Sequence, residues 1–221
     1  MSKKVWYAPN RFESYGEEEI KAVEECLRDG WLAGFGPRSI EFEEKVAKYF
    51  GKKYGLFVNS GSSACLLALA CLDLPKGCKV ITPACTFSTT LAPIIQLGYK
   101  PVFCDVELTS YVPNWVDVMN LITPNTTAIM IPNLIGNKPD WKKLRNMLYD
   151  IDREDIYLIE DSADTMTYTK ETDVATTSFY ASHVITAGGQ GGMVMFNNEK
   201  HKLRALSFRD WGRMGDDSEI I

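Results

Sequence analysis

Residues 54–64, with the sequence YGLFVNSGSSA, decide the fold, because a short apolar run passes through small polar residues directly into a helical pattern. The run Tyr54–Val58 is continuously apolar rather than alternating, which is typical of a strand covered on both faces of its sheet. A buried strand that leads into a helix in this way is the repeating unit of a βαβ fold.

The same unit recurs along the chain. Further strands are expected at Lys79–Thr82, Pro101–Cys104, Thr127–Ile131, Ile156–Glu160 and Gly192–Phe196. Helical patterns occur at Glu17–Asp29, Ile40–Phe50, Ser62–Leu72, Phe87–Leu97, Asn114–Ile122 and Trp141–Asp150. This order predicts an α/β fold: an open, mostly parallel sheet with helices on both sides, an α/β/α sandwich. Ligands of such sheets bind beyond the carboxyl ends of the strands, so the residues that follow each strand are the candidates for chemistry.

Composition excludes several classes of function. The 221 residues are 45% hydrophobic and 24% charged, and 24 basic against 29 acidic residues give a net charge of −5. This acidic balance argues against a nucleic-acid partner, whose binding depends on neutralised phosphates. No run of 18 apolar residues is long enough to span a membrane, and the opening residues lack the apolar stretch of a secretory signal. A cytoplasmic protein is expected.

The cysteines fit that location. There are six of them, none in a C-x-x-C pair: Cys26, Cys65, Cys71, Cys78, Cys85 and Cys104. We expect buried, reduced thiols that pack as small hydrophobic side chains. With two histidines in the chain and no cysteine after Cys104, no metal site is expected.

The loop after Tyr54–Val58 has two interpretations. Its small residues let backbone N–H groups converge at a helix N-terminus, and the hydroxyls of Ser62 and Ser63 add donors, which together suit a phosphate. Serine is also a favoured N-cap in any helix. Spacing alone does not decide between the two.

Three other loops hold candidate groups. Asp161 and Asp164 follow a buried strand, where carboxylates hold a metal, a ribose or a protonated ring nitrogen, or cap a helix. Phe87 follows another strand and either stacks on a planar ligand or packs in the core. His183 precedes a glycine-rich loop and is the candidate proton shuttle near neutral pH, since His201 is expected in a polar, exposed helix.

Four segments in this order and spacing resemble the DegT/DnrJ/EryC1/StrS family of sugar aminotransferases, within the fold-type I pyridoxal-phosphate enzymes. They are NSGSSA at 59–64, PACTFSTT at 83–90, IEDSADT at 159–165 and SFYASHVITAGGQGGMV at 178–194. The resemblance implies that 1–221 is a cofactor-binding large domain, with a helical segment at 1–52 and a sheet-containing core at 53–221. Family members are longer homodimers with a small C-terminal domain, so a fragment or truncated product is expected here.

The resemblance also assigns roles at a site for pyridoxal or pyridoxamine 5'-phosphate. It places Gly61, Ser62, Ser63 and Ser178 at the cofactor phosphate. Phe87 would stack on the pyridine ring, and Asp161 would pair with the ring nitrogen and keep it protonated. Asp164 matches a position, commonly Gln in the aminotransferases, that approaches the ring hydroxyl.

His183 is a departure from the aminotransferase pattern, which has at this position the lysine that forms the internal Schiff base. No lysine lies between Lys170 and Lys200, so the cofactor cannot be held covalently from this segment. Histidine here resembles the 3-dehydratases of nucleotide-linked 4-keto-6-deoxyhexoses, which use pyridoxamine phosphate and a histidine base. RDWGR at 209–213 resembles the same branch.

Within that branch, the cluster-free type is the nearer match. Ala163 and residues 214–216 stand where the other type has iron–sulfur cysteines. The cluster-free enzymes regenerate their amine from glutamate, which makes glutamate the expected amine donor. GGQGG at 188–192 departs from the family's shorter G-E-G-G. The alternatives are an aminotransferase-like enzyme acting on nucleotide-linked keto-sugars and a truncated, non-catalytic family member.

Overall fold

The computed structural model describes residues 15–31 and 36–213. The opening residues, in which no secretory signal is expected, and residues 214–216, where no cluster cysteine is expected, lie outside these ranges. Among the described residues, no helix is long and apolar enough to cross a membrane.

Seven strands form one sheet in the order β1-β7-β6-β5-β4-β2-β3. Their bounds are β1 Tyr54–Val58, β2 Lys79–Pro83, β3 Lys100–Cys104, β4 Thr126–Pro132, β5 Tyr157–Ser162, β6 Val174–Ser178 and β7 Gly192–Phe196. Neighbouring strands from β3 to β6 pair in parallel, whereas β7 pairs antiparallel with both β6 and β1. The mostly parallel sheet is therefore confirmed, with one strand running against the others.

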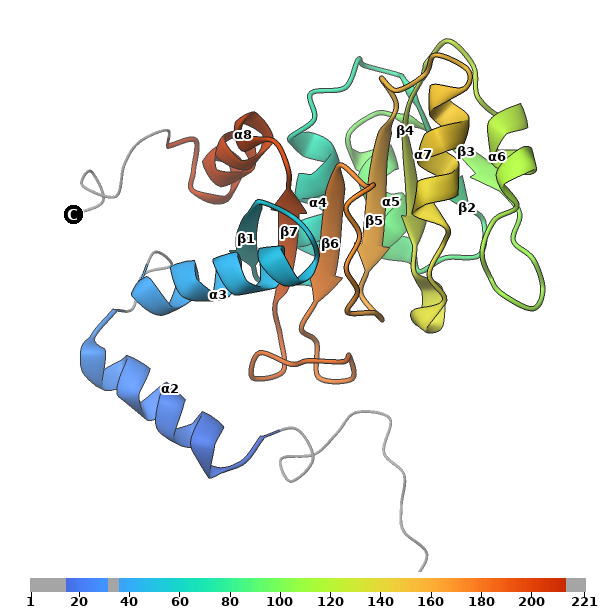
Figure 1. The fold of residues 1–221 in the computed structure, drawn as a ribbon. Coiled ribbons are helices and arrows are strands. Elements are labelled where there is room, and N and C mark those ends of the chain that lie inside the picture. The colour runs from blue at the N-terminus through green and yellow to red at the C-terminus, as the bar shows by residue number, and fades with distance from the viewer. Residues whose placement is uncertain (1–14, 32–35, 214–221) are drawn as a thin grey trace, which may run out of the picture.

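Helices cover both faces of the sheet, as the sequence predicts (Figure 1). Their bounds are α2 Glu17–Asp29, α3 Pro37–Tyr49, α4 Gly61–Ala70, α5 Ser88–Gln96, α6 Trp115–Asn120, α7 Trp141–Tyr149 and α8 Glu199–Arg209. One apolar core lies under α4, α5 and α8, and two further clusters lie under α6 with α7 and under α3. The chain is an α/β/α sandwich.

The helix α4 illustrates how burial positions the site. It has no charged residue, and Cys65, Ala68 and Leu69 are fully or almost fully buried against β6 and β7. Removing a leucine side chain of this kind from water contributes about 2 kcal/mol. The packing fixes the N-terminus of α4 at the carboxyl edge of the sheet.

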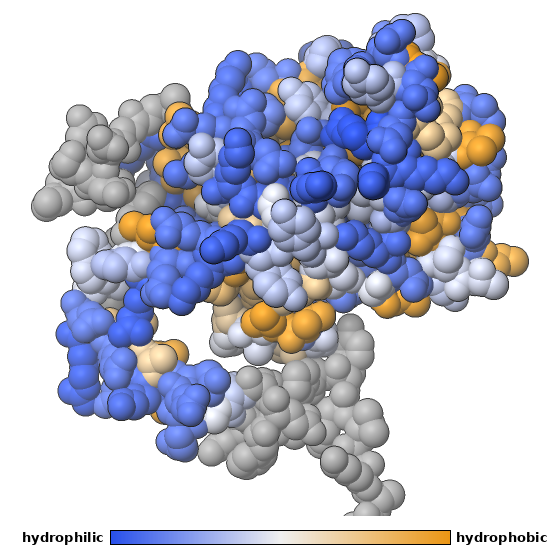
Figure 2. Space-filling view, in the orientation of Figure 1, coloured by the Kyte–Doolittle hydropathy of each residue, from blue (hydrophilic) through white to orange (hydrophobic). Residues whose placement is uncertain are grey.

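The helix α2 lies apart from the sandwich (Figure 1). It ends as predicted at Gly30, whose φ is 77°. None of its residues is buried, and the apolar face formed by Ile20, Val23 and Leu27 is exposed. The face of α2 seen in Figure 2 is mainly hydrophilic, as is most of this side of the molecule, where hydrophobic patches are separate.

The structure corrects three expectations from the sequence. The strand β6 was not predicted, because its Thr-rich sequence VATTS lacks an apolar run, yet all five residues are buried. His201 is buried rather than exposed, and its ring packs edge-to-face on Tyr157 with centroids 5.6 Å apart. Cys85 is exposed, whereas Cys65, Cys71, Cys78 and Cys104 are buried as expected and Cys26 is half-buried.

Candidate active site

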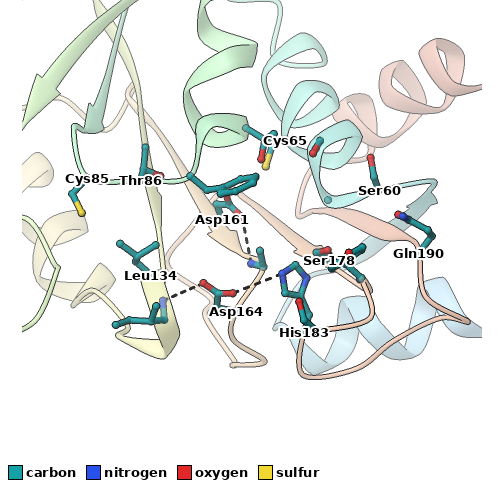
Figure 3. Close-up of a pocket in the computed structure, with 18 residues that line it drawn as sticks. Ser60, Cys65, Cys85, Thr86, Leu134, Asp161, Asp164, Ser178, His183 and Gln190 are labelled. Atoms are coloured by element: carbon teal, nitrogen blue, oxygen red, sulfur yellow. Dashed lines mark hydrogen bonds and ion pairs between the residues drawn. The ribbon is translucent and has the colours of Figure 1, made fainter. Parts of the chain in front are cut away.

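A cavity of about 750 Å³ opens at the carboxyl edge of the sheet, where loops follow β1, β2, β4, β5 and β6 (Figure 3). It is the place where ligands of open α/β sheets bind. The structure brings these sequence-predicted residues together in its lining: Gly61, Ser62, Phe87, Asp161, Asp164, Ser178 and His183. Ser63 is not among the described lining residues. Its backbone N–H instead donates to Ser60 Oγ at 3.1 Å.

The N-terminus of α4 forms one wall. Ser60 caps the helix, so the capping interpretation is correct, but Gly61 and Ser62 also line the cavity. The first N–H groups of a helix have no acceptor within the helix and carry partial positive charge. The segment therefore both caps its helix and offers N–H donors to an anion.

Two glycines allow the backbones around this wall to approach each other. A Cβ on Gly61 would lie 2.7 Å from Ser178 Cβ, and a Cβ on Gly192 would lie 2.3 Å from the carbonyl carbon of Ser60. Only glycine fits these contacts without a backbone shift. The close approach sets Ser178, the last residue of β6, beside the N-terminus of α4.

Asp161 lies on β5 at the base of the cavity and is 7% exposed. Thr90 Oγ1 donates to its Oδ2 at 2.8 Å, and the N–H of Ala163 donates to its Oδ1 at 3.3 Å. Burial raises the pKa of Asp161 above its usual range, and the hydrogen bond from Thr90 acts in the opposite direction. The carboxylate is desolvated but has donors on both oxygens.

Glu160, its neighbour, points away from the cavity because successive side chains of a strand face opposite sides of the sheet. Its Oε1 accepts hydrogen bonds from Asn133 Nδ2 at 2.6 Å and Thr169 Oγ1 at 3.0 Å, and its Oε2 accepts one from Thr172 Oγ1 at 3.2 Å. Glu160 is fully buried in this network. Its contacts are structural, which distinguishes it from Asp161 and Asp164.

Phe87 is not a core residue. Its side chain is 68% exposed, it lines the cavity, and it is the N-cap residue that precedes α5. An aromatic ring held at the mouth of a cavity can stack on a planar ligand. Of the two interpretations left open by the sequence, packing in the core is therefore wrong, and stacking on a planar ligand stays a prediction.

His183 and Asp164 face each other across the cavity floor (Figure 3). His183 Nε2 lies 3.8 Å from Asp164 Oδ1. Within the described chain, Nδ1 of His183 is buried without a hydrogen-bond partner, and its ring packs edge-to-face on Tyr180 at 5.9 Å. A carboxylate close to one nitrogen stabilises the imidazole when it carries a proton.

Among the cavity residues that were not selected as site residues from the sequence are Ile135 and Gln190. Ile135 lies in a turn after β4 with φ 48° and ψ 31°, a left-handed conformation that is strained for a β-branched residue. Its N–H donates to Asp164 Oδ2 at 3.1 Å. Gln190 comes from the GGQGG loop, in which Gly188, Gly189 and Gly191 all have positive φ.

The RDWGR segment lies elsewhere. Arg209 Nη1 donates to Glu43 Oε1 at 3.0 Å and to the carbonyl of Phe57 at 3.2 Å, which ties α8 to α3 and β1. None of the residues 209–213 lines the cavity. In the described part of the chain, no group of three or more His, Cys, Asp or Glu side chains could hold a metal ion.

Comparison with known proteins identifies the family of the chain. The sequence pattern of the DegT/DnrJ/EryC1/StrS aminotransferase family matches residues 13–220. The chain is 37% identical over 213 residues to lipopolysaccharide biosynthesis protein RfbH of Salmonella typhimurium, covering 90% of this chain and 48% of that protein. It is 36% identical over 212 residues to dTDP-4-dehydro-2,6-dideoxy-D-glucose 3-dehydratase of Saccharopolyspora spinosa, covering 89% of this chain and 45% of that one.

A solved structure is similar over the same region. GDP-4-keto-6-deoxy-D-mannose 3-dehydratase of E. coli, with bound hydrated PLP, superposes with a TM-score of 0.82 at 27% identity, covering 92% of this chain and 54% of that one. The chain thus spans about half the length of the curated relatives it matches.

Proposed function

This chain belongs to the DegT/DnrJ/EryC1/StrS aminotransferase family, and we propose that its cavity binds pyridoxamine or pyridoxal 5'-phosphate for the 3-dehydration of a nucleotide-linked 4-keto-6-deoxyhexose. The observation that carries the proposal is His183, which lines the cavity beside Asp164 in place of a lysine. None of the described residues that line the cavity is a lysine. Non-covalent binding of the cofactor and proton transfer by an imidazole are therefore the chemistry that this site supports best.

The residues present fit such a cofactor. The N-terminus of α4 and the hydroxyl of Ser178 offer N–H and O–H donors for a phosphate. Asp161 offers a buried carboxylate for a protonated ring nitrogen, and Phe87 an exposed aromatic ring for stacking. A cavity of about 750 Å³ is within the usual size of small-molecule sites.

When bound, the cofactor supplies an electron sink for the loss of a proton and of the sugar hydroxyl. With the cofactor bound, a nitrogen of the His183 imidazole would accept the proton that is lost and later return it, a step for which imidazole suits neutral pH. Asp164 stabilises the imidazolium that results, since its Oδ1 is 3.8 Å from Nε2. Asp161 would pair with the pyridine nitrogen and keep it protonated.

Similarity to two proteins named as 3-dehydratases supports this choice of reaction. The family's description as aminotransferases favours the second candidate, an aminotransferase-like enzyme for nucleotide-linked keto-sugars. The third candidate is a non-catalytic chain.

Because the chain spans about half the length of its relatives, we propose that 1–221 is the cofactor-binding large domain, with the sheet-containing core at 53–221.

We propose a cytoplasmic homodimer. The apolar face of α2, formed by Ile20, Val23 and Leu27, is exposed. It supports dimer formation because covering exposed apolar side chains with a partner removes them from water. The proposed amine donor is glutamate. Light scattering after size exclusion tests the oligomeric state, and a monomeric mass at micromolar concentration would contradict the dimer.

The test of function is to add pyridoxamine or pyridoxal phosphate to the protein and then GDP- or CDP-4-keto-6-deoxyhexose, with and without glutamate. Absorption spectra follow cofactor binding, and mass spectrometry identifies the sugar. A 3-deoxy product supports the dehydratase. An amino-sugar product supports the aminotransferase-like enzyme instead, and failure to bind either cofactor rules out both for this chain.

A further inference from the structure

We propose that Thr90 is a positioning residue of the cavity: with Thr86 it forms a chain of hydroxyl hydrogen bonds that fixes the Asp161 carboxylate and ties it to the turn carrying Phe87. This inference rests on the proposed function only where it concerns the cofactor. Its geometrical part concerns the protein alone.

The two hydroxyl hydrogen bonds run in one direction, from Thr86 through Thr90 to the Asp161 carboxylate. Thr90 Oγ1 donates to Asp161 Oδ2 at 2.8 Å, and Thr86 Oγ1 donates to Thr90 Oγ1 at 2.9 Å. A hydroxyl has one proton. Since Thr90 gives its proton to the carboxylate, its oxygen is the acceptor for Thr86, and the two bonds polarise each other in the same sense.

Thr90 provides the shortest hydrogen bond to Asp161. Two further donors are more distant: the Ala163 N–H donates to Oδ1 at 3.3 Å, and Thr176 Oγ1 donates to it at 3.5 Å. Thr90 is fully buried, so water cannot replace its hydroxyl. Removing it would leave Oδ2 without that donor in a desolvated position, which is costly for an ionised group.

The groups that face Asp161 come from several elements. Thr90 on α5 and Cys65 on α4 lower its pKa through hydrogen bonds, whereas burial and the charge of Asp164 raise it. Burial is the largest influence and Thr90 the next. The Thr90 hydroxyl is therefore the side-chain contact that most favours the ionised form of Asp161.

The same threonine holds the turn that carries Phe87. No side chain caps α5 at Phe87. Instead the Thr90 N–H donates to the carbonyl of Phe87 at 3.0 Å, and the Thr86 hydroxyl reaches across the turn to Thr90. Phe87 thus lies in a turn between Thr86 and Thr90, whose hydroxyls are hydrogen-bonded to each other. The proposed stacking residue and the proposed partner of the ring nitrogen are linked by two hydrogen bonds.

The test uses Thr90→Val, which keeps the side-chain shape and removes the donor, and Thr90→Ser, which keeps the donor. Thr82→Val is the matched control, since Thr82 is a fully buried threonine on β2 whose hydroxyl has no partner among the described residues. Carbon-13 NMR of the side-chain carboxyls follows Asp161 through a pH titration of the protein without cofactor, with Asp161→Asn assigning the signal. Titration calorimetry measures pyridoxamine phosphate affinity.

We expect Thr90→Val to raise the pKa of Asp161 and to weaken pyridoxamine phosphate binding about tenfold, equivalent to about 1.4 kcal/mol. Thr90→Ser should restore both, and Thr82→Val should change neither. An Asp161 titration and a cofactor affinity in Thr90→Val equal to those of the original protein would overturn the proposal.

Failure of the proposed function and failure of the role of Thr90 give different results. If the original protein does not bind pyridoxamine phosphate, the proposed function fails, and the Asp161 titration alone decides the role of Thr90. If Thr90→Val does not fold, Thr86→Val decides instead. Thr86→Val leaves Thr90 in place. A smaller upward shift of the Asp161 pKa in this variant would support the chain of hydroxyl hydrogen bonds, whereas an unchanged pKa would contradict the proposal.

Discussion

His183 Nε2 lies 3.8 Å from Oδ1 of Asp164, while the other oxygen of Asp164 accepts a hydrogen bond from the Ile135 N–H at 3.1 Å. The carboxylate is thus fixed on one side by backbone and faces an imidazole on the other (Figure 3). Both residues come from loops that follow buried strands, so the sheet sets their separation. This arrangement provides a proton carrier with a charged partner inside the cavity.

Replacement of His183 by alanine should slow dehydration by the factor that a general base contributes, while leaving cofactor affinity nearly unchanged. General acid–base groups contribute roughly 10²- to 10⁴-fold in rate, and that loss is the expected size. Product formation and pyridoxamine phosphate affinity are measured side by side. His201→Gln is the matched control because His201 lies in α8, away from the cavity lining, and should retain turnover. Full activity of His183→Ala would remove its role as base.

Ile135→Asn should stabilise the protein. The left-handed backbone at Ile135 costs about 1–2 kcal/mol for a residue of this type, and asparagine tolerates it. Little burial is lost, since the Ile135 side chain is 67% exposed. Urea denaturation should show a gain of about 1 kcal/mol. Ile151→Asn, at an exposed isoleucine without positive φ, should give no such gain, and equal effects at both positions would contradict the assignment of strain.

Asp161→Asn should make the cofactor-free protein more stable and bind pyridoxamine phosphate less tightly. Burial raises the pKa of Asp161, so the folded protein binds this proton more readily than the unfolded chain. The ionised carboxylate therefore destabilises the fold at neutral pH. Removing it should raise the urea midpoint at pH 7, and the gain should shrink as the pH falls towards 4. A lower midpoint at pH 7 would show that its hydrogen bonds outweigh its desolvation.

The sequence predicted the βαβ order, the helix α2 from Glu17 to Asp29 and the parallel sheet, because continuous apolar runs and a C-terminal glycine report local structure and burial directly. It missed β6, whose buried threonines are polar in sequence but satisfied in the fold. His201 was misjudged for a related reason: burial of a polar side chain depends on what packs against it, here Tyr157.

In the candidate site, too, some residues could be predicted from local sequence patterns and others could not. Residues directly after predicted strands, such as Asp161 and Phe87, could be selected because strand ends converge at one edge. Ile135 and Thr90 could not, since one depends on a backbone torsion and the other on a hydrogen bond between residues 71 positions apart. No local pattern reports either feature.

Lys52 should make stability rise with pH between about 8 and 10.5. Its side chain is 5% exposed, and its Nζ donates to the carbonyl of Thr169. Burial lowers the pKa of Lys52 to about 8, although the charge of Glu160 acts in the opposite direction. Between that value and about 10.5, the usual pKa, the unfolded chain binds a proton that the folded protein does not, so stability increases with pH.

Buried thiols oppose this trend above pH 9, because burial raises the pKa of Cys71 to about 12 and that of Cys104 to about 11. The contribution of Lys52 is therefore isolated by difference. From pH 7 to 9 the original protein should gain about 1 kcal/mol relative to Lys52→Met, as measured by urea denaturation. Lys52→Arg, whose side chain stays protonated, should lack the gain as well. Parallel pH profiles of all three proteins would mean that Lys52 keeps its proton throughout, and that the charge of Glu160 outweighs the effect of burial on its pKa.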